Sequence, residues 1–77
     1  MMAKWTPCKR REFISKVRKL GFESPEPGAR HFYMRCGTFN LTFPGNAEYS
    51  VPQIKVLLKE IELGTKKKIS LEKWQEL

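Results

Sequence analysis

The feature that most restricts the fold is a pair of alternating segments joined at a glycine. Arg30 to Arg35 and Thr38 to Phe43 each alternate between apolar and polar side chains, and Gly37 lies between them. Such a pattern predicts two antiparallel strands connected by a tight turn. Any fold proposed for the chain must therefore include this hairpin and cover one of its faces.

Burial of one hairpin face also predicts how the two strands pair. With Cys36-Gly37 as a two-residue loop, the opposed pairs would be Met34 with Phe39, Phe32 with Leu41, Tyr33 with Asn40, and His31 with Thr42. A shift of one residue would set Arg35 opposite Phe39 and mix the faces, so we expect the first register. The open polar face would then carry His31, Tyr33, Arg35, Thr38, Asn40 and Thr42.

Amphipathic helices are predicted before and after the hairpin. The first would begin at Thr6-Pro7, with Thr6 as the N-cap, and stop at Gly21. The second would begin after Ser50, which forms a capping box with Gln53, and would be closed by Gly64. The apolar stripes are Phe13, Ile14, Val17 and Leu20 in the first helix, and Val51, Ile54, Leu57, Leu58 and Ile61 in the second.

The remaining segments complete an α-β-β-β-α order. Residues 22–24 could form a short edge strand, and the turn-rich residues 25–28 should then end it. We expect an α+β two-layer sandwich with an antiparallel three-stranded sheet and both helices on one face. At 77 residues there is room for one domain, residues 1–77, with a core at 6–64 and a basic tail at 65–77. Ser70 could cap a last short helix, and its docking stays open.

The charge balance favours an anionic partner. Fifteen Lys and Arg face eight Asp and Glu, which gives a formal net charge of +7. A positive field of this size attracts phosphate, although it also suits an acidic protein. The predicted first helix concentrates this charge against one acidic residue, Glu12. Its expected RNA-binding residues are Lys9, Arg10, Arg11, Lys16, Arg18 and Lys19, each of which could alternatively just solvate the helix.

Other function classes lack a sequence signal. No apolar run approaches the roughly 20 residues of a spanning helix, and no apolar leader of about 7–15 residues is present, so we expect a cytoplasmic protein without membrane contact. Two cysteines and one histidine lack the spacing of a zinc site, and no metal or cofactor is expected. Cys8 and Cys36 should be ordinary thiols. A thiolate at Cys8, next to Lys9 and Arg10, is the alternative.

Several short segments together resemble the HicA/YcfA-like toxin family. They are Lys-Leu-Gly-Phe at 19–22, Gly-Ala-Arg-His at 28–31 opening a strand, the strand 39–44, and the apolar helix from Val51; the resemblance covers roughly residues 9–63. It implies a fold like the double-stranded-RNA-binding domain and the toxin role in a type II toxin–antitoxin system. It also implies mRNA cleavage without metal, and inhibition by a HicB-like antitoxin. The positive charge of this chain predicts that such an antitoxin is acidic where it contacts the chain.

The same resemblance assigns a catalytic residue. His31 matches the histidine of the family, and Gly28 matches the glycine before it. Ala29 stands where family members usually have serine, and Gly45-Asn46 stands where a further histidine often follows the proline. The chemistry fits independently, because RNA supplies its own 2′-hydroxyl nucleophile and a neutral imidazole, with an ordinary pKa of about 6.5, can remove its proton. Supporting candidates are Arg30, Tyr33 and Arg35.

Two other hypotheses remain open at this stage. The chain could be a noncatalytic RNA-binding module in which His31 only contacts a phosphate or a 2′-hydroxyl. It could instead be a protein-interaction subunit that binds an acidic partner. Composition alone favours a structural role for a lone histidine at the start of a strand. Product formation separates the first two hypotheses, and loss of RNA binding with salt separates the second from the third.

Overall fold

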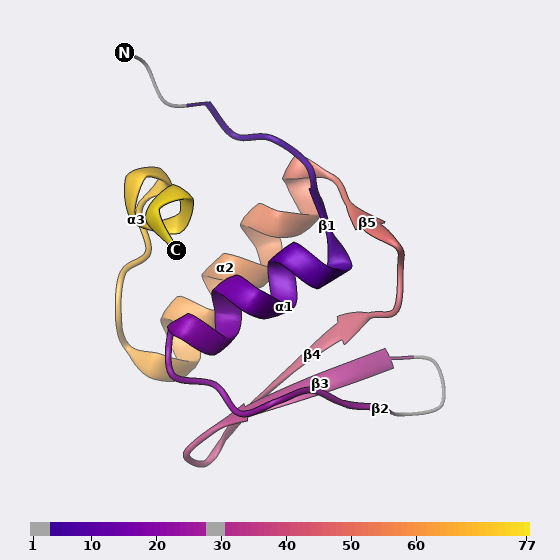
Figure 1. Ribbon diagram of the computed structural model, residues 1–77. Coiled ribbons are helices and arrows are strands. Elements are labelled where there is room, and N and C mark those ends of the chain that lie inside the picture. The colour runs from indigo at the N-terminus through magenta and orange to yellow at the C-terminus, as the bar shows by residue number, and fades with distance from the viewer. Residues whose placement is uncertain (1–3, 28–30) are drawn as a thin grey trace.

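The chain folds into helices packed against a β-hairpin, which confirms the α+β class. The computed structural model describes residues 4–27 and 31–77. Its elements are β1 (Cys8–Lys9), α1 (Arg10–Lys19), β2 (Glu26–Pro27), β3 (His31–Cys36), β4 (Phe39–Pro44), β5 (Glu48–Tyr49), α2 (Val51–Thr65) and α3 (Leu71–Glu76). Helices α1 and α2 lie side by side, with the β3–β4 hairpin below them (Figure 1).

The strands form two separate groups. β3 and β4 make the long antiparallel ladder, the two residues of β2 pair with the other edge of β3, and β1 pairs with β5. The strand expected at residues 22–24 therefore lies at Glu26–Pro27 instead. Phe22 is buried, with its ring centroid 6.0 Å from that of Phe39, and the next residue, Glu23, donates a backbone hydrogen bond to the Arg35 carbonyl of β3 at 2.8 Å. The predicted segment thus contacts β3 at one point, whereas the paired residues are Glu26 and Pro27. Pro27 is tolerated because an edge strand leaves one side unpaired.

The hairpin turns one residue later than predicted. Its loop is Gly37-Thr38, and the ladder pairs Cys36 with Phe39, Met34 with Leu41, and Phe32 with Phe43. The predicted register was thus wrong by two residues. Gly37 has a φ of 61° and occupies the first loop position, where a tight hairpin turn needs a residue that tolerates positive φ. Because strand side chains repeat every two residues, a shift of two leaves the predicted faces unchanged.

The first helix starts later than its local capping signal predicts. Cys8–Lys9 are extended and pair with Glu48–Tyr49, so α1 begins at Arg10 and not at Thr6-Pro7. Lys9 is the N-cap residue and makes no side-chain capping bond. Strand pairing and burial of Cys8 thus override the weaker local preference of a threonine cap. At the other end Gly21 follows the helix with a φ of 106°, as a helix stop requires.

The second helix begins as predicted and ends one residue beyond its glycine. Ser50 and Gln53 form the expected capping box. The helix continues through Gly64 to Thr65, and Lys66 adopts the left-handed conformation that was expected of Gly64, with a φ of 59°. Gly64 is needed for a different reason. A Cβ at this position would lie 2.4 Å from the Phe39 ring, so the absence of a side chain lets helix and strand approach.

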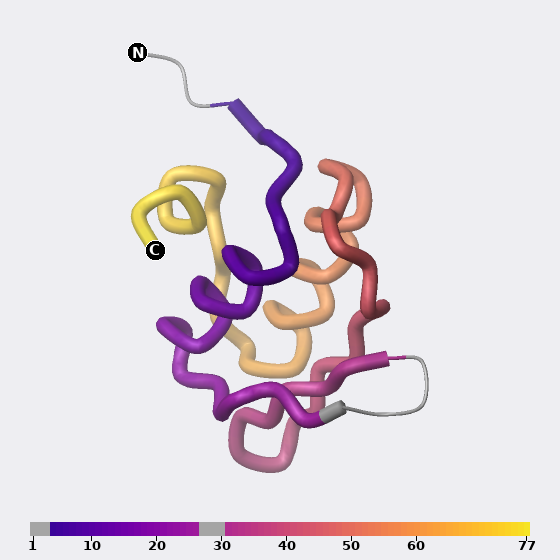
Figure 2. The backbone as a smooth tube through the Cα atoms, turned by 45° about the vertical axis from the view of Figure 1, so that its right-hand side comes forward, coloured from indigo at the N-terminus to yellow at the C-terminus, as the bar shows by residue number. Residues whose placement is uncertain are grey.

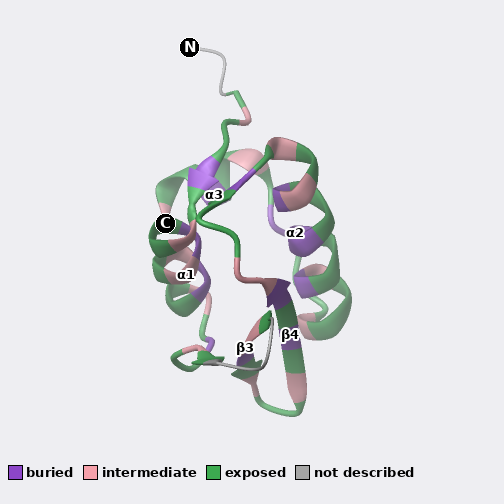
Figure 3. Cartoon of the chain, turned by 90° about the vertical axis from the view of Figure 1, so that its right-hand side faces the viewer, coloured by how far each residue is buried: buried purple, intermediate pink, exposed green. Residues whose placement is uncertain are grey.

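The core is built around Phe13 and includes the C-terminal helix. The Phe13 ring is fully buried, and its centroid lies 5.4 Å from that of Phe43, 5.1 Å from that of Tyr49 and 5.7 Å from that of Trp74. Buried positions lie on the sides of α1, α2 and the hairpin that face one another (Figure 3). Ser70 caps α3 as predicted. The tail therefore docks, because Trp74 and Ile69 belong to the same buried cluster.

The N-terminal segment lies between α3 and the beginning of α2 (Figure 2). The Gln75 side chain donates a hydrogen bond to the Lys4 carbonyl at 2.6 Å, and the Lys55 ammonium lies 5.7 Å from the centre of the Trp5 ring. These contacts join both ends of the chain to the helical layer. In the two described ranges, no helix has the length and apolar character needed to cross a membrane.

Candidate nucleic-acid interface

The outer side of α1 carries exposed cations that border two adjoining hollows. One hollow of about 540 Å³ is lined by Lys9, Arg10, Arg11, Glu12, Ile14 and Ala47. A second of about 540 Å³ is lined by Arg11, Ile14, Ser15, Arg18, Lys19 and Phe22. Arg11 and Ile14 line both, so the hollows adjoin one another along the helix. We call the exposed cations Lys9, Arg11, Arg18 and Lys19 the basic surface.

Arg10, at the N-terminal end of α1, makes contacts with residues from β3 and from the segment that follows β4. Its Nη1 donates a hydrogen bond to the Gly45 carbonyl at 2.8 Å, and its guanidinium carbon lies 5.1 Å from the centre of the Phe32 ring. Its backbone N–H also donates to the Ala47 carbonyl at 3.0 Å. Arg10 thereby fastens the segment after β4, and the start of β3, to the first turn of α1.

Lys16 makes a comparable contact between α1 and α3. Its ammonium donates a hydrogen bond to the Trp74 carbonyl at 3.0 Å and lies 5.0 Å from the centre of the Trp74 ring. The side chain is half-buried, so part of its charge serves the docking of α3. Of the six cations predicted to bind RNA, Arg10 and Lys16 thus have internal partners, whereas the other four are exposed.

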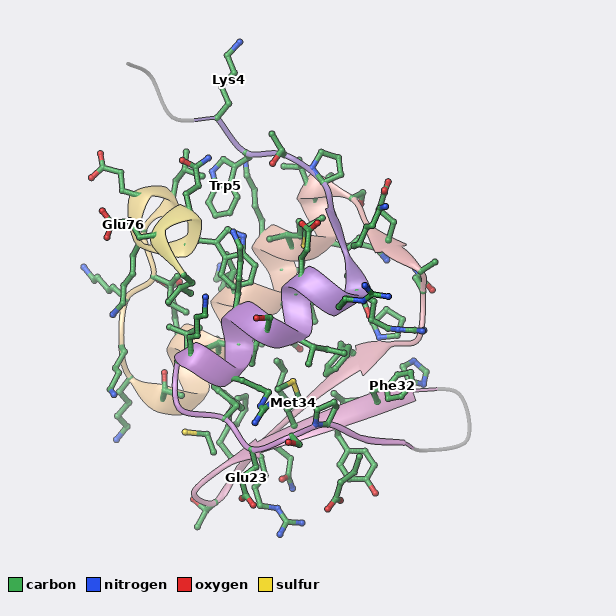
Figure 4. The ribbon with its side chains drawn as sticks, viewed as in Figure 1. Lys4, Trp5, Glu23, Phe32, Met34 and Glu76 are labelled. Atoms are coloured by element: carbon green, nitrogen blue, oxygen red, sulfur yellow. The ribbon has the colours of Figure 1, made fainter. Side chains whose placement is uncertain are left out.

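His31 is exposed at the first position of β3, opposite Pro44 in the ladder. The next residue, Phe32, lies under the Arg10 guanidinium, and Figure 4 shows it at the end of the hairpin below the start of α1. The strand end that carries His31 therefore adjoins the Arg10–Arg11 end of α1. Gly28 and Arg30, the other candidates before the strand, lie outside the described residues.

Tyr33 and Arg35 share the His31 face but have acidic surroundings. Strand alternation puts all three on one face, yet Tyr33 is half-buried and pairs with Glu26 of β2. A small hollow of about 20 Å³ there is lined by Glu23, Ser24, Glu26, Tyr33 and Arg35. Arg35 Nε lies 3.3 Å from the Asn40 side-chain oxygen, to which it donates. Because residues 22–24 predict an edge strand that ends before Pro25, the position of Glu26 opposite Tyr33 was not expected from the sequence.

Cys8 does not have the environment of a reactive cysteine. Burial raises the pKa of its thiol above the ordinary value, and the nearby Lys16 charge opposes this only in part. Cys8 is therefore a neutral core thiol, contrary to the thiolate alternative. Within residues 4–27 and 31–77, no three His, Cys, Asp or Glu side chains gather as metal ligands would.

Comparison with known proteins adds no assignment. No protein-family model, no curated protein and no solved structure matches this chain.

Proposed function

We propose that this protein is a ribonuclease that holds RNA on the basic surface of α1 and cleaves it at His31 without a metal ion. The observation that carries the proposal is the adjacency of an exposed histidine and an exposed cationic helix. Arg10 links the two parts through the strand end, because it contacts the Phe32 ring and the Gly45 carbonyl. Phe32 points to the opposite face of β3 from His31, so RNA would pass around this strand end to meet both the cations and the histidine. A strand of RNA that follows α1 toward its first turn would reach the His31 end of β3.

Binding would come mainly from phosphate contacts. The four cations of the basic surface are exposed, and α1 contains only one acidic residue, Glu12. Each phosphate that a Lys or Arg neutralises releases condensed counterions, so affinity should fall steeply as salt is added. The partly exposed Ile14 between the cations gives the hollows an apolar floor on which a base or sugar could rest.

Cleavage would use the nucleophile of the RNA itself. His31, as a neutral imidazole, accepts the 2′-hydroxyl proton while the oxygen attacks the neighbouring phosphorus. The P–O5′ bond breaks, the leaving 5′-oxygen takes a proton from water, and a 2′,3′-cyclic phosphate remains on the upstream fragment. Charge builds on the phosphate oxygens in the transition state, and any cation of the basic surface that reaches them would stabilise it. This chemistry requires no cofactor.

The toxin role is part of the same proposal. Expressed in the cytoplasm, a ribonuclease of this kind would stop growth by degrading mRNA. Its HicB-like antitoxin should present acidic residues to the basic surface and cover His31, because blocking that face excludes RNA. An antitoxin complex that still admits RNA to His31 would show that inhibition works by another route.

One observation favours a second candidate, a noncatalytic RNA-binding module. Tyr33 and Arg35, the neighbours of His31 on its strand face, lie beside Glu23 and Glu26. Carboxylates there would repel a phosphate placed over the middle of the strand. In this case His31 would contact the RNA backbone without transferring a proton.

Product analysis decides between the two candidates. Purified protein is incubated with a mixed-sequence RNA in excess chelator, and the new ends are examined for a 2′,3′-cyclic phosphate. The ribonuclease proposal predicts such ends at a rate that chelation leaves unchanged. RNA that is bound in a salt-sensitive manner and recovered intact would assign the protein to the noncatalytic class. Absence of both binding and cleavage would refute the two candidates together.

A further inference from the structure

One edge of β4 is bare and lies next to the outer side of α2. In the described part of the chain β4 pairs only with β3, so alternate residues along its other edge present backbone N–H and C=O groups without a ladder partner. The strand ends at Pro44, whose carbonyl accepts a hydrogen bond from the Tyr49 hydroxyl. A bare edge of this kind is a template for pairing with another strand.

Exposed apolar side chains flank this edge. Val56 is 61% exposed and Leu63 is 72% exposed, and these are the large apolar side chains that the described chain leaves most open. They are seven residues apart, which puts them on one face of α2 at a separation of about 10 Å along the axis. Single exposed apolar residues are ordinary on a protein surface, so the significance of this pair depends on the bare strand edge beside it.

Two hollows fix the direction of α2 relative to β4. Leu63 lines a hollow of about 420 Å³ with Phe39, Asn40, Leu41, Thr42, Glu60 and Gly64. Val56 lines another of about 320 Å³ with Pro44, Pro52, Gln53 and Leu57. Leu63 therefore lies at the Phe39 end of β4 and Val56 at the Pro44 end. We call this strip, formed by the β4 edge with Val56, Lys59, Glu60 and Leu63, the β4–α2 seam.

We propose that a second copy of this chain docks on the β4–α2 seam, with the two β4 strands antiparallel about a two-fold axis. Antiparallel pairing brings the Phe39 end of one strand to the Pro44 end of the other. Leu63 of each copy then faces Val56 of the second copy. Lys59 and Glu60 lie midway between these two residues, so each lysine comes next to the opposite charge on the other copy. This self-complementarity is what a two-fold interface requires.

Dimerisation and RNA binding should depend on salt in opposite directions, and the dimer does not depend on the proposed ribonuclease activity. Two copies at +7 each repel one another, and the Debye length of about 8 Å at 0.15 M salt reduces that repulsion. Dimerisation should therefore strengthen as salt rises, whereas RNA binding should weaken. A seam of one strand and one helix face belongs among small specific interfaces, so we expect a dissociation constant on the order of micromolar or weaker.

Sedimentation equilibrium tests the proposal with variants on and off the seam. The parent should dimerise, more tightly at higher salt. Leu63→Asp should weaken the dimer by about tenfold or more, because it buries a carboxylate against Val56. The matched control, Thr6→Asp, makes the same charge change at an exposed site away from the seam and should leave the dimer intact.

A charge exchange tests the pairing direction. Lys59→Glu alone should weaken the dimer, and adding Glu60→Lys to it should restore affinity, because each lysine again meets an acidic side chain. A parent that stays monomeric up to about a millimolar, the weakest range of specific association, would overturn the proposal. So would a dimer that Leu63→Asp leaves unchanged. RNA binding by Leu63→Asp, measured in parallel, should equal that of the parent, which keeps this test independent of the proposed ribonuclease activity.

Discussion

Arg10 and Arg11 are adjacent and identical in type, yet their replacement should affect different properties. Arg10→Ala should lower folding stability, whereas Arg11→Ala should weaken RNA binding. Arg10→Ala removes the hydrogen bond to the Gly45 carbonyl and the contact with the Phe32 ring. A hydrogen bond from a charged donor contributes about 1.5–3 kcal/mol, and a cation over an aromatic ring at a partly exposed site about 0.5–1 kcal/mol. Taking the lower values because Arg10 is half-buried, we expect a loss of about 2 kcal/mol of folding free energy.

Thermal unfolding followed by circular dichroism measures this difference. For a domain of this size, about 2 kcal/mol corresponds to a decrease of roughly 8–16 °C in Tm. Arg11→Ala should change Tm by less than about 2 °C, since its exposed side chain adds little to packing. Arg11→Ala should instead reduce the slope of log affinity for RNA against log salt by about 0.7–0.9. Equal losses of Tm in the two variants would refute the assignment of a structural role to Arg10 and an RNA-binding role to Arg11.

Three further predictions concern the core and its edges. Gly64→Ala should destabilise the protein by about 1–3 kcal/mol in urea unfolding although alanine favours helix, because its Cβ would clash with Phe39; a gain in stability would contradict this packing. Trp74→Ala should cost about 3–5 kcal/mol and release α3, detected as fast amide exchange at residues 71–76; protection there would show that α3 is held by other contacts. The free energy of unfolding should decrease as pH rises above 9.0, the ordinary pKa of a thiol. The Cys8 pKa is raised in the folded state, so the unfolded chain loses this proton first. Cys8→Ala should make this decrease of stability with pH smaller.

The parts of the fold that the sequence predicts well are those with local signals. The capping box at Ser50 and the cap at Ser70 act within a few residues, and both form as expected. The alternation on either side of Gly37 predicts the hairpin and its two faces, but not the register of its strands. The start of α1 was misplaced because its position depends on pairing between Cys8–Lys9 and Glu48–Tyr49, forty residues apart. Threonine and proline at residues 6 and 7 carry no sign of that partner.

The candidate site shows the same division. The sequence pattern of α1 predicts a cationic helix, but it does not show which of the cations have internal partners and which are exposed to a ligand. The partners of Arg10 and Lys16 are main-chain carbonyls 35 and 58 residues away. Backbone carbonyls leave no mark in the sequence, so such anchors become visible only in the folded chain. Alternation does predict the exposed position of His31, whereas its chemical role depends on where RNA is held.

The rate of RNA cleavage by His31→Ala tests the central claim most directly. Because His31 is exposed at a strand end, the variant should fold with an unchanged circular dichroism spectrum, and it should bind RNA almost as well as the parent. Single-turnover cleavage in chelator should nevertheless fall by about 10²–10⁴-fold, the usual contribution of a positioned proton-transfer group. A folded His31→Ala protein that cleaves RNA at the parent rate would contradict the assignment of His31 as the reacting group.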